Sequence, residues 1–249
     1  MPLAAELKTL YHLMLSPIKG DTHAQRLENF YGKQAEHYDA FRKRLLHGRQ
    51  ELWNRLPVAP GEVWVDLGGG TGANLEHIGQ DISQLGKVYV VDLAPSLLKV
   101  AQQRCEANGW GNVTPVEADA TTFRPTEGGA DAVTLSYSLT MIPDWFAALE
   151  NAWAMLKPGG RIALVDFYVS RKYPATPHRR HRWLTRSFWP TWFGCDNVFL
   201  SPDHVPYLHR RFEVSHFSEH SAPVPYLPLV RVPYYLFIGR KPLESTPPV

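Results

Sequence analysis

Three glycines, Gly68, Gly70 and Gly72, follow directly on an acid, Asp66, and a short apolar run. Glycine is needed where backbone N–H groups approach a ligand closely or where φ is positive. The apolar run Val63–Val65 predicts a buried parallel strand, and a helix is expected from near Ala73. Because a glycine loop between a strand and a helix presents free N–H groups, it is suited to hold a ligand.

The loop is compatible with two ligands. The spacing Gly68-x-Gly70-x-x-Ala73 matches a dinucleotide fingerprint, whereas Asp66-x-Gly68-x-Gly70-x-Gly72 resembles the S-adenosylmethionine loop of Rossmann-like methyltransferases. An acid beside a pyrophosphate would repel it, whereas the cationic amino acid end and sulfonium of S-adenosylmethionine would be attracted by Asp66. The acid therefore favours S-adenosylmethionine over a dinucleotide and over a turn that binds nothing.

Polar residues also follow the next apolar runs. Asp92 ends one run and is predicted to accept hydrogen bonds from both hydroxyls of a ribose. Asp119 follows another and could accept from an adenine amino group, and Ser136–Ser138 follow a third. Since the carboxyl ends of parallel strands meet at one edge of a sheet, we expect these groups to converge with the glycine loop.

The elements that must position them alternate between short strands and helices, which is typical of a doubly wound α/β sheet. Strands are expected at 63–65, 87–92, 112–117, 130–135, 161–167, 211–217 and 232–239, with helices at 95–107 and from 145 to 156 and a tight turn at 157–160. The predicted fold is a Rossmann-like seven-stranded, mostly parallel sheet with helices on both faces. We expect one domain over residues 1–249, with a helical lid at 1–57, a cofactor-binding core at 61–168, an insertion at 169–205 and closing strands at 206–241.

Composition excludes several classes. The 249 residues are 44% hydrophobic and 20% charged, as in ordinary globular proteins. A net charge of +2 gives no global attraction to nucleic acid, and two cysteines indicate neither a disulfide framework nor a metal site. No apolar run is long enough to span a membrane and no secretory signal is evident, so a cytoplasmic protein is expected.

The N-terminal residues are expected to be helical. Residues 2–15 predict an amphipathic helix that either docks on the core or lies on a membrane surface. Within residues 22–55, Tyr31, Tyr38 and Arg42 are spaced to share a helical face. These residues are either a wet surface edge or part of a lid over the cofactor.

A basic and aromatic stretch begins after Tyr168 and has no acidic residue before Cys195. Its arginines alternate with tryptophan and phenylalanine, which suits an anionic membrane surface, single-stranded nucleic acid, or simply a solvated insertion. A proline-rich link at 223–230 carries apolar side chains that either pack down or project as a rim.

The whole pattern resembles the class I S-adenosylmethionine-dependent methyltransferases, and in detail the N-methyltransferases of betaine-lipid synthesis. The similar segments are Tyr38–Arg42, Leu45–Arg49, Asp66–Gly72, Tyr137–Trp145, Val165–Tyr168, Trp192–Asp196, Pro225–Pro228 and Val232–Tyr235. The resemblance implies conversion of diacylglyceryl-homoserine to its N,N,N-trimethyl form, with S-adenosyl-L-homocysteine as the second product. It further implies a peripheral position on the membrane and a partner enzyme that makes the homoserine lipid.

Site residues are assigned on this basis. The predicted cofactor contacts are Tyr31, Asp66, Gly68, Gly70, Gly72, Asn74, Asp92, Leu93, Asp119, Ala120 and Ser136. Tyr38 and Tyr137 are predicted to hold the amine during catalysis, because a tyrosine hydroxyl can orient an amine and pass on its proton. Tyr168 is expected beside the acceptor, and Arg42, Arg179, Arg180 and Arg182 are candidates to bind its carboxylate. No metal site is expected.

Three alternatives remain open from the residues alone. One is a methyltransferase for another acceptor, such as a quinone ring carbon or a polar amine. Another is an RNA-binding or RNA-methylating protein, which the near-neutral charge and the absence of a recognisable RNA module disfavour. The last is a cofactor-binding protein without activity.

Overall fold

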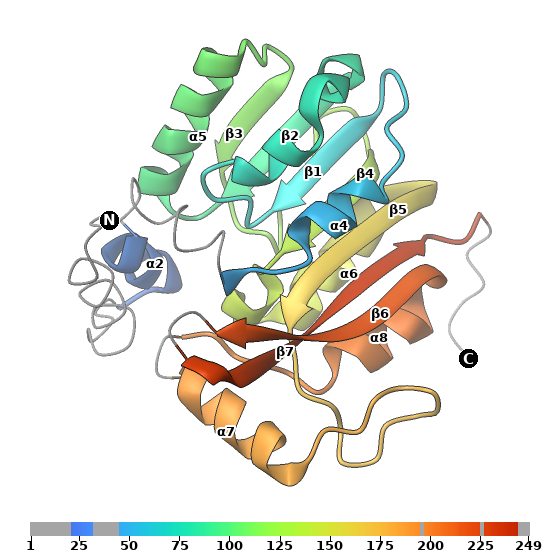
Figure 1. Ribbon diagram of the computed structural model, residues 1–249. Helices are drawn as coiled ribbons and strands as arrows, with labels where there is room; N and C mark the ends of the chain where they lie inside the picture. The colour runs from blue at the N-terminus through green and yellow to red at the C-terminus, as the bar shows by residue number, and fades with distance from the viewer. Residues whose placement is uncertain (1–20, 32–44, 195–196, 225–226, 244–249) are drawn as a thin grey trace.

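The computed structural model describes residues 21–31, 45–194, 197–224 and 227–243 (Figure 1). The predicted helix at 2–15, together with Tyr38 and Arg42, lies outside the described residues. Among those that are described, no helix is long and apolar enough to cross a bilayer.

A seven-stranded sheet in the order β3-β2-β1-β4-β5-β7-β6 forms the centre of the molecule. The parallel strands are β1 (Val63–Leu67), β2 (Lys87–Asp92), β3 (Val113–Glu117), β4 (Ala130–Ser136) and β5 (Leu156–Phe167). The closing strands β6 (Glu213–Val224) and β7 (Leu227–Arg240) form an antiparallel hairpin, with β7 paired to β5. The Rossmann-like fold class predicted from the sequence is confirmed.

Helices cover both faces of this sheet, because its central strands are apolar on both sides. One face packs against α4 (Arg49–Asn54), α5 (Pro95–Asn108) and α7 (Trp183–Gly194). The other packs against α6 (Trp145–Met155) and α8 (His204–Arg211), as Figure 1 shows behind the sheet. The helix α2 (His23–Tyr31) meets α5, where the carboxylate of Glu28 accepts hydrogen bonds from Ser96 N at 3.1 Å and Ser96 Oγ at 2.9 Å.

Several boundaries differ from the sequence prediction. The glycine loop leads into two short 3₁₀ helices, Ala73–His77 and Gly79–Gln84, instead of an α-helix. The expected tight turn at 157–160 is a bulge inside β5, where Gly159 has φ +76° and donates to Lys241 O at 2.9 Å.

The C-terminal third differs most. The helix α8 was not predicted from the sequence. It includes Arg211, which was expected to begin the strand at 211–217. The proline-rich link is not a separate rim, because β6 and β7 extend into it as far as the pair Val224–Leu227. Proline has no N–H group to donate, so it is tolerated at ladder positions where no donor is needed.

Candidate functional site

A cavity of about 270 Å³ lies at the carboxyl ends of β1, β2 and β4. Its polar lining comes from the glycine loop, from the ends of two strands and from the turn after β4. Its apolar lining includes Leu27 of α2, Leu97 of α5 and the segment 141–143. The full lining is Leu27, Gly68, Gly70, Val91, Asp92, Leu93, Leu97, Ala118, Asp119, Ala120, Thr121, Tyr137, Ser138, Met141, Ile142, Pro143 and Asp144.

Gly68 brings the glycine loop against the turn after β4. Its φ is +67°, and a Cβ added there would lie 2.4 Å from the Cβ of Ser138. The backbone N–H groups of Gly68 and Gly69 donate to the carbonyl of Val91 at 2.8 and 3.1 Å, which ties the loop to β2. Any side chain at position 68 would push the glycine loop away from the turn after β4, and both of these segments line the cavity.

Asp66 lies beneath the loop and is not among the residues that line the cavity. Its carboxylate accepts from Asn74 Nδ2 at 2.9 Å and from Thr134 Oγ1 at 2.6 Å, and Asn74 Oδ1 in turn accepts from Arg49 Nε at 3.0 Å. Burial raises the pKa of Asp66, against the opposing effect of those two hydrogen bonds. Asp66 and Asn74 therefore hold the loop from inside the protein, and the direct attraction expected between Asp66 and a cationic ligand is not what this geometry provides.

Asp92 is placed as the sequence predicted, at the cavity end of β2. One carboxylate oxygen accepts from Gly70 N at 2.9 Å and the other from Ala94 N at 3.0 Å. Each carboxylate oxygen has two lone pairs, so a carboxylate can accept from a ligand hydroxyl as well as from a backbone N–H group. Asp119 is exposed at the end of β3 and accepts from Thr121 N and Oγ1, each at 2.7 Å.

Tyr137 forms the cavity wall after β4 with a φ of +55°, which is uncommon for a residue other than glycine. Its hydroxyl donates to the carbonyl of His47 at 2.6 Å, which joins this wall to the start of α4. Burial raises the pKa of Tyr137 well above 10, so its hydroxyl stays protonated at neutral pH. Its predicted catalytic role stays a prediction, and the structure adds a positioning role.

Asp166, to which the sequence pattern assigns no role, supports the same wall from β5. It is fully buried and accepts from Thr140 N at 3.1 Å, Thr140 Oγ1 at 2.7 Å and Phe167 N at 2.8 Å. Burial raises its pKa to about 7 despite these hydrogen bonds. The motif Val165–Tyr168 was a signal for it, but only the fold shows what the acid contacts.

Besides Asp66, three predicted cofactor contacts do not line the cavity. Ser136 is buried and its Oγ has no hydrogen-bond partner among the described residues. Gly72 has φ +68° and packs beside Ala101 of α5, while Asn74 is occupied by Asp66 and Arg49. Gly68, Gly70, Asp92, Leu93, Asp119 and Ala120 do line it. The side chain of Tyr31 lies outside the described part.

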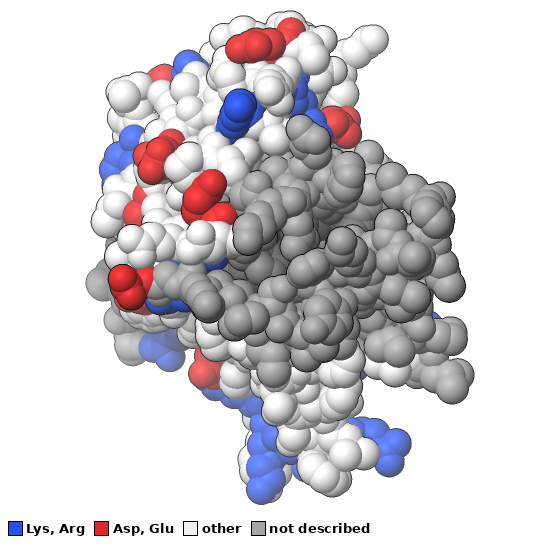
Figure 2. Space-filling model, turned by 90° about the vertical axis from the view of Figure 1, so that its left-hand side faces the viewer, with Lys and Arg blue, Asp and Glu red and all other residues white. Residues whose placement is uncertain are grey.

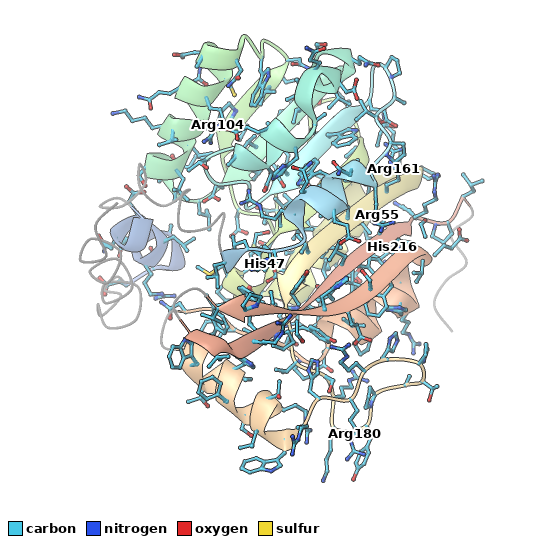
Figure 3. All side chains as sticks on the ribbon, in the orientation of Figure 1. His47, Arg55, Arg104, Arg161, Arg180 and His216 are labelled. Carbon is cyan, nitrogen blue, oxygen red and sulfur yellow. The ribbon has the colours of Figure 1, made fainter. Side chains whose placement is uncertain are left out.

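The predicted acceptor residues are not brought together at the cavity. Tyr168 packs on the opposite face of the sheet from Phe167 and donates to Glu219 Oε1 at 2.5 Å. Arg179 donates its backbone N–H to Glu219 at 2.8 Å, and Arg180 lies at the lower end of the molecule, away from His47 (Figure 3). Arg182 is exposed just before α7. Carboxylate binding by these arginines at the cavity is therefore not supported.

The cavity suits S-adenosylmethionine by its chemistry. Carboxylates at two strand ends can accept from ribose hydroxyls and an adenine amino group, and apolar side chains such as Leu93, Leu97 and Met141 can cover a flat ring. When bound, this cofactor supplies an activated methyl group on a sulfonium. Asp92, Asp119 and the glycine loop are the residues that would hold it.

The family of the chain follows from comparison with known proteins. The ubiE/COQ5 methyltransferase family matches residues 19–179, which is more than half of the 249 residues and includes the whole glycine loop. The chain belongs to this family. It is therefore a class I methyltransferase that uses S-adenosylmethionine.

Its curated relatives in this family are moderately similar. The ubiquinone/menaquinone biosynthesis C-methyltransferase UbiE of Psychromonas ingrahamii is 29% identical over 162 residues, covering 63% of this chain and 64% of the relative. UbiE of Vibrio cholerae is 28% identical over 162 residues, covering 63% and 62%. The chain thus spans less than two thirds of the length of these relatives.

Solved structures share the fold at low sequence identity. YcgJ of Bacillus subtilis superposes with a TM-score of 0.64 at 15% identity, over 79% of this chain and 98% of that chain. The N-methyltransferase NodS of Bradyrhizobium japonicum, in complex with S-adenosyl-l-homocysteine, gives 0.61 at 15% identity over 89% and 100%. A phosphoethanolamine N-methyltransferase of Haemonchus contortus, in complex with S-adenosyl-L-methionine, gives 0.63 at 16% identity over 87% and 60%. These matches place the methyltransferase among class I folds.

Sequence reasoning missed part of the lining. Leu27, Met141, Ile142 and Pro143 were given no role, although 141–143 fall inside the motif Tyr137–Trp145. Leu27 carries only an ordinary helical pattern, so nothing local marks it. Its place over the cavity results from the packing of α2 on α5.

Proposed function

We propose that this methyltransferase acts on the amino group of diacylglyceryl-homoserine and converts it to the N,N,N-trimethyl betaine lipid. The proposal is supported first by the specific motifs of that family, above all Tyr137–Trp145. Five residues of this motif's first seven, Tyr137, Ser138, Met141, Ile142 and Pro143, form one wall of the cofactor cavity.

The observation that carries the proposal is a continuous series of aromatic rings from that wall to the protein surface. The ring centroid of Tyr137 lies 4.6 Å from Phe167, which lies 4.9 Å from Phe193. Phe193 lies 5.5 Å from Trp189, which lies 5.0 Å from the exposed Phe188 of α7. An acceptor with two acyl chains is insoluble in water, and an enzyme for it needs an apolar surface close to the reacting centre.

The chemistry fits an apolar wall. An alkylamine is mostly protonated near neutral pH, and only its neutral form has the lone pair that can attack carbon. Desolvation beside Met141 and Ile142 favours the neutral amine. The amine nitrogen forms its bond to the methyl carbon as the carbon–sulfur bond breaks, and the proton of the primary and secondary amine passes to water. Protein groups mainly position the reactants.

Two parts of the proposal rest on the sequence resemblance alone. Arg42, outside the described residues, is the cation proposed for the homoserine carboxylate, and Tyr38 is the residue proposed to orient the amine. The resemblance also implies a further enzyme, which would supply the homoserine lipid.

A second candidate is methylation of a quinone ring carbon. It is favoured by the relatives, which are named for C-methyl transfer in ubiquinone and menaquinone biosynthesis. The two candidates share an apolar acceptor but differ in the attacking atom, so the identity of the product separates them.

The test is a methyl-transfer assay with radiolabelled S-adenosylmethionine and the purified protein in detergent. Diacylglyceryl-homoserine, a quinone precursor, free homoserine and diacylglycerol are offered separately, and products are identified by mass. We expect label in the homoserine lipid and none in diacylglycerol, which lacks the amine. Label only in the quinone precursor would establish the second candidate, and label in free homoserine alone would exclude a lipid acceptor.

A further inference from the structure

The helix α7 presents an exposed face without a charged residue. Trp183 is 67% exposed, Leu184 56% and Phe188 44%, and at 100° per residue all three lie on one side of the helix with Ser187 and Thr191. The Thr191 hydroxyl donates to the carbonyl of Ser187 at 2.9 Å, so that hydroxyl is already satisfied within the helix. The opposite side is anchored in the core by Trp189 and Phe193.

Cations surround the start of this face. Arg180 and Lys172 lie over the ring of Tyr173, at 5.3 and 5.4 Å from its centroid, and Tyr173 is 73% exposed. Arg182 is exposed at the residue before α7. Basic side chains gather at the lower end of the face in Figure 2, the end at which Figure 1 places α7.

Not every arginine in this stretch is available. Arg171 forms an ion pair with Asp203 at 2.6 Å. Arg179 donates its backbone N–H to Glu219 at 2.8 Å and its guanidinium to the hydroxyl of Ser221 at 3.5 Å, both on β6. No ion pair involving Lys172, Arg180 or Arg182 is found among the described residues. Lys172, Arg180 and Arg182 therefore contribute positive charge beside the apolar face.

We infer that α7 and the segment 172–182 form a docking surface for an anionic membrane. Tryptophan, leucine and phenylalanine on one helix face, flanked by lysine and arginine, suit the boundary between lipid headgroups and acyl chains. The buried side of the same helix reaches the cavity wall through Phe193, Phe167 and Tyr137. Docking through this surface places the cofactor cavity beside the bilayer. The inference rests on the proposed function only for the identity of the acceptor.

Charge and apolar contact make separable contributions to such binding. Each basic residue near an anionic surface strengthens binding about fivefold at low salt, and salt screens this contribution. Replacing Lys172, Arg180 and Arg182 by Gln together is therefore expected to weaken binding about a hundredfold. Replacing Trp183, Leu184 and Phe188 by Ser is expected to weaken it at least about tenfold and to leave little salt-resistant binding.

The experiment is co-sedimentation of the full chain with phosphatidylcholine vesicles containing about one third phosphatidylglycerol, at low and high salt. Matched controls are Lys99→Gln, an exposed cation of α5 at the opposite end of the molecule, and Leu243→Ser, which is 79% exposed. Both controls should bind as the parent does. Cofactor affinity and the thermal midpoint are measured for every variant, because α7 also packs on the core.

The results discriminate clearly. Strong parental binding that both triple variants lose and both controls keep supports the docking surface. The docking surface is overturned if the parent does not bind these vesicles, or if the triple variants bind them as the parent does. It is also overturned if the parent is retained on RNA but not on vesicles at the same salt concentration. If the serine variant does not fold, quenching of tryptophan fluorescence by vesicles of brominated lipid provides a second test. The quenching should be smaller for Trp183→Phe than for the parent. Equal quenching in the two proteins overturns the proposal.

Failure of the proposed function would look different. Methyl transfer to detergent-dispersed diacylglyceryl-homoserine does not require docking, so the variant with Lys172, Arg180 and Arg182 replaced by Gln should retain it. Loss of that activity in the parent, with vesicle binding intact, removes the acceptor assignment and leaves the docking surface standing.

Discussion

The Tyr137 hydroxyl and the His47 carbonyl, 2.6 Å apart, join the turn after β4 to the beginning of α4. Tyr137 lines the cofactor cavity, and His47 lies two residues before α4. This part-buried hydrogen bond ties the cavity wall after β4 to the beginning of α4.

Tyr137→Phe should lower the free energy of unfolding by about 1–3 kcal/mol, because the part-buried carbonyl of His47 loses its donor. Turnover should fall with no change in the shape of its pH profile, since the hydroxyl stays protonated in the parent. Denaturant titration and pH-dependent turnover are the measurements. The control is Tyr89→Phe, which removes a hydroxyl bonded to Glu127 away from the cavity and should leave turnover unchanged. A displaced pH profile for Tyr137→Phe would instead indicate direct proton transfer.

Gly68→Ala should abolish measurable cofactor binding and lower the thermal midpoint. Both the backbone strain at φ +67° and the contact with Ser138 at 2.4 Å oppose a methyl group. Gly109→Ala is the matched control, because Gly109 has the same φ of +67° but nothing within 4 Å of an added Cβ. Gly109→Ala should lower the free energy of unfolding only by the backbone strain, about 1–2 kcal/mol. Equal losses in the two variants would mean that close packing of the loop on Ser138 is unimportant.

Asp92→Ala should weaken S-adenosylmethionine binding by about 1.5–3 kcal/mol in calorimetry, through loss of charged hydrogen bonds. Asp92→Asn should not rescue it, because both carboxylate oxygens accept backbone N–H groups and an amide has only one acceptor. Asp131→Ala is the control, since Asp131 also accepts a backbone N–H, from Val63 at 2.9 Å, at the amino end of β1. Unchanged affinity in Asp92→Ala would remove the ribose assignment.

His204 predicts a pH dependence of stability. It is fully buried against Trp145, neither ring nitrogen has a hydrogen-bond partner among the described residues, and burial lowers its pKa from 6.5 to about 3. Between those values only the unfolded state binds the proton, so this residue lowers stability as pH falls.

His204→Phe should therefore gain stability relative to the parent on acidification, by about 3 kcal/mol between pH 7 and 4. The difference in unfolding free energy between the two proteins at pH 8 serves as the reference for the differences at lower pH. The effect of the substitution on packing then cancels. Parallel stability curves for the two proteins would show that His204 acquires its proton in the folded state.

The strands and the cofactor loop could be predicted from local sequence. Short apolar runs that end in Asp66, Asp92 and Asp119 indicate parallel strands, and β2 was predicted with its observed bounds of Lys87–Asp92. Glycine spacing predicts a close backbone approach because no other residue tolerates it, and Gly68 meets Ser138 in that way. These features depend on neighbours along the chain, and so they can be predicted without knowledge of the fold.

Which side chain faces the cavity was decided by packing at long range. Phe167 and Tyr168 are adjacent in sequence, yet they enter the cores on opposite faces of the sheet, and only Phe167 joins the ring series that starts at Tyr137. Asp66 was expected at the ligand but is bound by Asn74 and Thr134.

The sequence by itself determined that the chain is a Rossmann-like α/β protein with a glycine loop suited to S-adenosylmethionine, because strand periodicity and glycine conformation are local properties. Only the tertiary structure decided that Arg171 is paired with Asp203 while Arg180 and Arg182 stand beside the exposed face of α7. The partner of Arg171 comes from a distant segment of the chain. The charge that remains at a surface depends on which distant groups folding brings into contact.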